Sequence, residues 1–91
     1  FAWVNSTGVP LVLRALWFQL ATAASSGSTV MDVNVNGVTL YPTGKPTIAA
    51  GAVTTGILVA AFTIPAFGVV TVDVDSAGTG ALDLTAQLDV A

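Results

Sequence analysis

The most regular hydrophobic pattern lies near the middle of the chain, on both sides of the dipeptide Asn36-Gly37. Asn-Gly favours a two-residue type I′ turn, because both central residues must adopt a positive φ. With that turn, one face of the hairpin is apolar and consists of Met31, Val33, Val35, Val38 and Leu40. The other face consists of Asp32, Asn34, Asn36, Thr39 and Tyr41. Turn and alternation agree on one register, so we predict a β-hairpin over residues 31–41.

The last third of the chain also alternates with a period of two. Val70, Val72 and Val74 alternate with Thr71, Asp73 and Asp75. After a turn over residues 76–80, an inner face of Leu82, Leu84, Ala86, Leu88 and Val90 alternates with Asp83, Thr85, Gln87 and Asp89. This pattern predicts two half-buried strands. We expect their carboxylates to lie on neighbouring strands as solvated surface charge.

The segment Leu11–Ala21 is apolar on both faces and contains Arg14 as its only charged residue. Glycine and proline before it and a Ser/Gly cluster after it favour a strand, with a helix as the alternative. A strand that is apolar on both faces is either central in its sheet or covered by a neighbouring chain. Leu11, Leu13, Trp17 and Phe18 are therefore the candidate interface residues.

The remaining segments complete an all-β chain. Val53–Ile64 predicts one or two strands with a kink at Gly56, Pro65–Gly68 predicts a turn, and Phe1–Asn5 predicts a short leading strand. About seven or eight strands in all indicate an antiparallel β-sandwich that is jelly-roll-like. We expect residues 1–91 to form a single domain, either alone or as part of a longer or processed chain.

One uncharged run, from Ile48 to Val70, is long enough to span a membrane as a helix. It contains Gly51, Gly56, Pro65 and Gly68, and no Lys/Arg cluster flanks it. Two uncharged strands joined by a Pro/Gly turn explain the same residues better, so we expect no membrane insertion. A small membrane or pilin-like subunit is the least favoured alternative.

Composition excludes most catalytic chemistry. The chain has no Cys and no His, and its formal net charge is −3 with only two basic residues. It therefore lacks a thiol nucleophile, the commonest general base and the basic patch that nucleic acids require. Asp32–Gly37 resembles the start of an EF-hand loop, but Thr43 stands where that loop needs a glutamate. We expect no catalytic, cofactor or metal site, and hence no enzyme.

Surface binding is the function class that remains. Hydrophobic residues make up 54% of the chain and charged residues only 8%, which suggests that neighbouring subunits cover part of the apolar surface. Most aromatic side chains at strand spacing belong to a core. Tyr41, which the hairpin register turns outward, and Trp17, which lies opposite Phe18, are the candidates for stacking on a sugar ring.

Four segments, in order, resemble a β-sandwich domain of tailed-phage virion proteins. The segments are Ser28–Tyr41, which contains DVNVNG, Lys45–Gly51 (KPTIAAG), Val70–Gly78, which begins with VTVDVD, and Leu82–Leu88, which begins with LDLT. The resemblance covers residues 28–88 and implies a virion role in a minor tail, fibre or head-decoration protein, without a cofactor. Its shared residues are structural, so it assigns no functional residue.

From these observations we expect a phage structural protein on the particle surface, as capsid decoration, head fibre or tail-fibre module. Its partners would be further copies of itself, with a trimer favoured, and other capsid or tail proteins. A carbohydrate-binding module that recognises a host surface glycan is the alternative.

Overall fold

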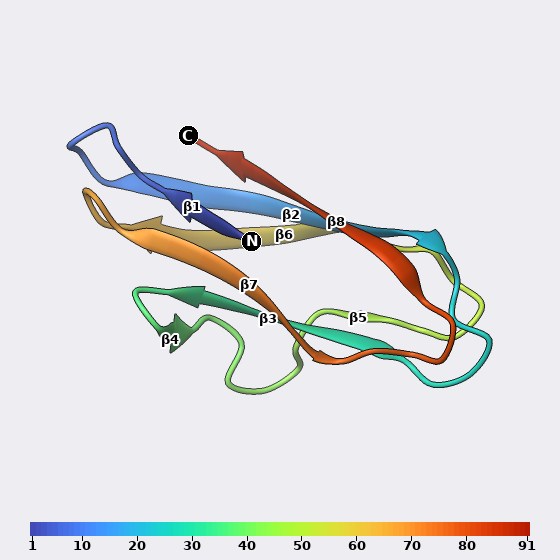
Figure 1. Cartoon of the computed structure of the whole chain (residues 1–91). Helices are drawn as coiled ribbons and strands as arrows, with labels where there is room; N and C mark the ends of the chain where they lie inside the picture. The colour runs from blue at the N-terminus through green and yellow to red at the C-terminus, as the bar shows by residue number, and fades with distance from the viewer.

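The computed structural model describes all of residues 1–91 as an antiparallel β-sandwich without helices. Its eight strands are β1 (Ala2–Val4), β2 (Leu11–Thr22), β3 (Thr29–Val35), β4 (Val38–Thr39), β5 (Thr47–Ile48), β6 (Thr54–Ile64), β7 (Val69–Ser76) and β8 (Leu82–Val90). Sheet A has the order β1-β7-β3-β4, with β5 also paired to β3, and sheet B has the order β6-β2-β8. The two layers run along the length of the molecule, and most loops lie at its two ends, whereas the loop between β4 and β5 lies along one side (Figure 1).

The core forms where the inner faces of the two sheets meet. Its buried residues come from both layers: Leu13, Leu16, Phe18, Leu20 and Ile64 of sheet B, and Met31, Val33, Val35, Ile48, Val70 and Val72 of sheet A. Each fully buried Leu, Ile or Phe side chain stabilises the fold by about 1.5–3 kcal/mol. The core is small, because only 17 of the 91 residues are buried. The outer faces of both sheets therefore remain open.

The long apolar segment is the central strand of sheet B, not a helix. Strand β2 pairs with β6 on one side and with β8 on the other. Both pairings shift register between Leu13 and Ala15, so the inner face continues from Leu13 to Leu16 rather than to Ala15. This bulge at Arg14 explains why neither the even nor the odd positions of the segment form a polar face.

The hairpin prediction is confirmed at its turn and as far as Leu40, whose N–H donates to the Val33 carbonyl at 2.8 Å, and it is wrong beyond that residue. Asn36 and Gly37 have φ values of 51° and 81°, and Val35 pairs with Val38 as predicted. Strand β4 ends at Thr39, so the chain bends away and Tyr41 does not pair with Asp32. The Asn36 side-chain oxygen accepts a hydrogen bond of 2.9 Å from the Val69 N–H, which attaches the turn to β7.

The other strand predictions are confirmed with small shifts of boundary. The kink in β6 lies at Gly56, which has a φ of 69° next to a register shift in the pairing with β2. The hydroxyls of Thr54 and Thr55 bond the backbone of Phe18 there, at 3.0 and 3.3 Å. No helix of the length and apolarity needed to cross a membrane is present.

Asn5 ties two loops together at one end of the sandwich. It is fully buried, and its Nδ2 donates hydrogen bonds to the carbonyls of Val9, Ile64 and Pro65 at 2.8–3.3 Å. Its Oδ1 accepts hydrogen bonds from the N–H and the hydroxyl of Thr7. A buried amide with all its partners present holds the β1–β2 loop against the end of β6.

We predict that Asn5→Ala lowers the free energy of unfolding by roughly 2–4 kcal/mol, because it removes the donor to the buried Ile64 carbonyl and to the part-buried carbonyls of Val9 and Pro65. Urea unfolding measures the change. Ser6→Ala is the control, since Ser6 is exposed and makes no side-chain hydrogen bond, and it should alter stability little. A loss below 1 kcal/mol for Asn5→Ala would contradict this role.

Candidate functional site

The outer face of sheet B carries the candidate site, with Trp17 at its centre. Trp17 pairs with Ile57 of β6 on one side and with Gln87 of β8 on the other. Gln19, one step along the same face, pairs with Thr85. The bulge at Arg14 is what directs Trp17 and Gln19 outward while Leu16 and Phe18 enter the core.

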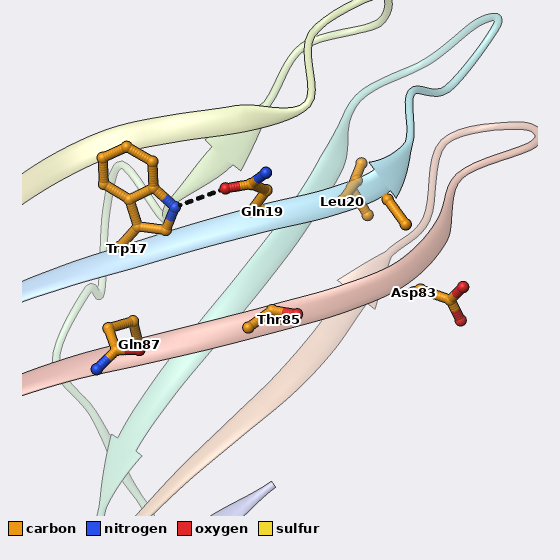
Figure 2. Close-up of a pocket in the computed structure, with 7 residues that line it drawn as sticks. Trp17, Gln19, Leu20, Asp83, Thr85 and Gln87 are labelled. Atoms are coloured by element: carbon orange, nitrogen blue, oxygen red, sulfur yellow. Dashed lines mark hydrogen bonds between the residues drawn. The ribbon is translucent and has the colours of Figure 1, made fainter.

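A shallow hollow of about 530 Å³ lies beside the indole. It is lined by Trp17, Gln19, Leu20, Ala21, Asp83, Thr85 and Gln87. Figure 2 shows Trp17 and Gln19 together on β2, with the side chains of β8 in a row alongside. The indole Nε1–H donates a hydrogen bond of 3.1 Å to Oε1 of Gln19, which fixes both side chains. The indole, the amides, a hydroxyl and a single carboxylate can bind a polar ring, but they do not provide an acid–base pair.

The two sides of Trp17 differ in chemistry. On the β8 side, the outer residues form a polar row of Asp83, Thr85, Gln87 and Asp89. On the β6 side, they form an apolar strip of Val12 and Ala15 from β2 with Ile57, Val59 and Ala61 from β6. Ile57 is 69% exposed and Val59 is 87% exposed, so the sandwich itself does not cover this strip.

The predicted interface set divides between the core and the surface. Leu13 and Phe18 are completely buried in the core, so the prediction that they form a contact between chains is wrong. The reason is the bulge, which places Leu13 on the same inner face as Phe18. Trp17 and Leu11 are half-buried, and Trp17 lies on the outer face.

Tyr41 does not share a platform with Trp17. Its ring packs edge-to-face against Phe62, with ring centroids 5.7 Å apart and an interplanar angle of 73°. The prediction that it points outward is wrong, because the strand that would have fixed its direction ends at Thr39. Tyr41 instead lines a separate hollow of about 350 Å³, between segment 41–47 and residues 57–59 of β6.

The carboxylates are also arranged differently from the expectation. Asp73 and Asp75 lie on β7 in sheet A, whereas Asp83 and Asp89 lie on β8 in sheet B, so the four do not occupy neighbouring strands. The neighbour of Asp73 is Asp32 on β3.

Lys45 compensates the charge on the outer face of sheet A. Its Nζ lies 2.5 Å from Oδ2 of Asp75 and 3.6 Å from Oδ2 of Asp32. The hydrogen bond to Asp75 raises the pKa of Lys45 above its usual value, against a smaller opposing effect of desolvation. The hydroxyl of Thr39 also donates to Asp32. No group of three or more His, Cys, Asp or Glu side chains lies close enough together to hold a metal ion.

Sequence reasoning missed the polar surroundings of Trp17. The alternation of β8 identified Thr85 and Gln87 as outer residues, but it did not reveal that β8 lies beside β2. Pairing between strands about 70 residues apart leaves no local signal.

No protein-family model, curated protein or solved structure matches the chain in the comparisons with known proteins.

The burial of Tyr41 predicts a titration that can be read directly, because it is the only tyrosine. Burial raises the pKa of its phenol above the ordinary value of 10.0. As the pH rises above about 10, the unfolded chain loses the phenol proton while the folded state keeps it. The free energy of unfolding therefore falls over this pH range. Ultraviolet titration should show a higher midpoint in the folded protein than in urea.

Phe62→Ala should reduce the shift, because it removes the ring against which Tyr41 packs. Equal midpoints for the folded and the unfolded protein would contradict the placement of Tyr41.

Proposed function

We propose that this chain is a non-enzymatic structural subunit on the surface of a phage particle, where it assembles with copies of itself and with capsid or tail proteins. The observation that carries the proposal is the apolar strip on β6 and β2. It exposes large aliphatic side chains on a regular sheet instead of covering them within the chain. Exposed apolar patches of this kind mark interaction surfaces.

Two further observations support an assembly role. The four sequence segments that resemble tailed-phage virion domains all fall within the sandwich, and Asn36 and Gly37 form the turn that the resemblance shares. The chain also carries few charges for its size, so association leaves few charged groups to be desolvated.

The assembly is tested by comparing one charge placed on the apolar strip with one placed on the polar row. We predict that the wild-type chain, of 9.1 kDa, has a mass in light scattering that is a multiple of this value at high concentration. Val59→Lys should shift the population to monomer, because it brings an unpaired charge into the contact.

Gln87→Lys is the matched control, since Gln87 is exposed on the outer face of the same sheet but lies on β8. It should leave the mass unchanged. A wild-type monomer at every concentration, or equal effects of the two substitutions, would contradict the proposed assembly.

A second candidate function rests on the hollow beside Trp17. An indole fixed by Gln19 and surrounded by Thr85, Gln87 and Asp83 has the mixture of stacking and hydrogen-bonding groups that binds a sugar of a host glycan. On a glycan array, Trp17→Ala should abolish binding, whereas Tyr41→Ala should not, because Tyr41 lies in another hollow. An array without signal for the wild-type chain would remove this function.

A further inference from the structure

Strand β6 has one hydrogen-bonding edge without a partner. It pairs with β2 on one side, and no backbone hydrogen bond joins Ile57–Thr63 to any other strand. At eleven residues it is the longest edge strand of the molecule, and it contains neither a charge nor a proline. Segment 41–47 runs beside it but leaves the hollow of about 350 Å³ open next to Ile57 and Val59.

The backbone hydrogen bonds of β2 show which residues of β6 direct their N–H and C=O groups to this free edge. The N–H and C=O groups of Val12 both form hydrogen bonds with Ala91, so they point to the β8 side. The N–H and C=O groups of the next residue, Leu13, therefore point to β6. At the other end of β2, the Leu20 N–H donates to the carbonyl of Val53. The backbone N–H and C=O groups of Leu20, and those of Phe18 and Leu16 at the same parity, therefore point to β6.

The partners of these β2 residues on β6 are Gly56, Leu58 and Phe62, which therefore direct their backbone groups toward β2. Burial alternates without interruption along β6 from Ile57 to Ile64, so the backbone direction alternates too. The residues that direct N–H and C=O to the free edge are Ile57, Val59, Ala61 and Thr63.

Strand β6 carries neither a charge nor a proline along this edge, and the neighbouring segment 41–47 leaves Ile57 and Val59 69% and 87% exposed. Natural proteins protect long edges with charges, prolines, bulges or a covering segment. The opposite edge of sheet B is protected in this way, since β8 carries Asp83 and Asp89 and lies beside Phe1 and Trp3 of the N-terminal segment. In sheet B, β6 and β8 lie on opposite sides of β2.

We propose that β6 is a pairing edge for a second copy of this chain, antiparallel, so that two three-stranded sheets join into one sheet of six strands. This inference rests on the proposed assembly and names its contact. The register with the most hydrogen bonds pairs Ile57 with Thr63 and Val59 with Ala61 of the other copy. Each of the four edge residues then exchanges both its bonds, about eight in total, around a two-fold axis at Ala60.

Charge placement favours this edge contact over stacking of the outer faces. Stacking would bury Asp83, Asp89 and the exposed Arg14, which share the outer face with the apolar strip. Edge pairing leaves these three residues at the surface, with Lys45, which lines the hollow beside Ile57 and Val59, as the charged residue next to the joint. It places the acidic β8 strands of the two copies at opposite margins of the joined sheet, about 24 Å apart. It also brings Val59 and Ala61 of both copies together along the joint.

The contact is small for a stable interface. In this register residues 57–63 of each copy pair over about 23 Å of strand, and a joint about 10 Å deep gives an area on the order of 230 Å² per copy. Standard interfaces bury about 800 Å² per partner. The pair should therefore dissociate at micromolar concentration and form at millimolar concentration, or wherever a particle holds copies side by side. Pairing by identical edges is two-fold, which departs from the trimer expected from the sequence.

Two substitutions separate edge pairing from face stacking in light scattering over this concentration range. Val59→Pro removes an N–H that points away from β2, so it blocks the free edge while the β2–β6 bonds remain. Ala15→Lys places a charge on the outer face directly beside Val59, one strand away from the edge. Circular dichroism checks that both variants keep the β fold.

Edge pairing predicts that Val59→Pro weakens dimerisation at least tenfold and that Ala15→Lys changes it less than threefold. The opposite pattern would overturn edge pairing while leaving the assembly proposal intact. A wild-type trimer would overturn it in the same way. Only a wild-type chain that stays monomeric at millimolar concentration would contradict both.

A single cysteine provides a second test that does not depend on folding of the proline variant. In the proposed register Ala60 lies opposite its own copy as a non-hydrogen-bonded pair, with Cα atoms about 4.5 Å apart, within disulfide range. The chain has no cysteine of its own. Ala60→Cys should form a disulfide-linked dimer under mild oxidation at least tenfold faster than Ala86→Cys, which is equally half-buried on β8. Equal rates would overturn the proposed register and edge.

Discussion

The packing of the inner face of β2 against β3 and β7 is the interaction on which the rest of the structure depends. Leu13, Leu16, Phe18 and Leu20 supply much of the core from a single strand. Because three of these side chains follow the usual alternation and Leu13 does not, the strand must bulge at Arg14 to bury them all. The same bulge fixes what faces outward, since it places Ala15, Trp17 and Gln19 on the open side of sheet B.

Local patterns predicted most of the fold but not the relation between its layers. The Asn36-Gly37 turn and the alternation of β8 could be recognised because turn chemistry and side-chain period are properties of a few adjacent residues. The direction of Tyr41 could not, since it depends on where β4 ends and on contact with Phe62, 21 residues away. The grouping of the aspartates was wrong for the same reason, because it required knowing that β7 and β8 enter different sheets.

The distribution of charge connects the fold with the proposed role. Sheet A holds a compensated group in which Lys45 bridges two aspartates, and β8 carries the acidic margin of sheet B. The long strand β6, which carries no charge, also has a free edge and the most exposed aliphatic side chains. A monomer in isolation gains nothing from such a strand, and aggregation is its usual consequence. In an ordered particle of the kind we propose, the same strand would provide a repeatable contact between copies.

Amide hydrogen exchange along β6 tests the central claim most directly, because each edge N–H reports on its own partner. The account predicts that the amides of Ile57, Val59, Ala61 and Thr63 exchange freely in dilute protein and become protected at millimolar concentration, while those of Leu58 and Phe62 are protected throughout. If the first four amides exchange freely at every concentration while those of Leu58 and Phe62 stay protected, pairing through this edge is contradicted.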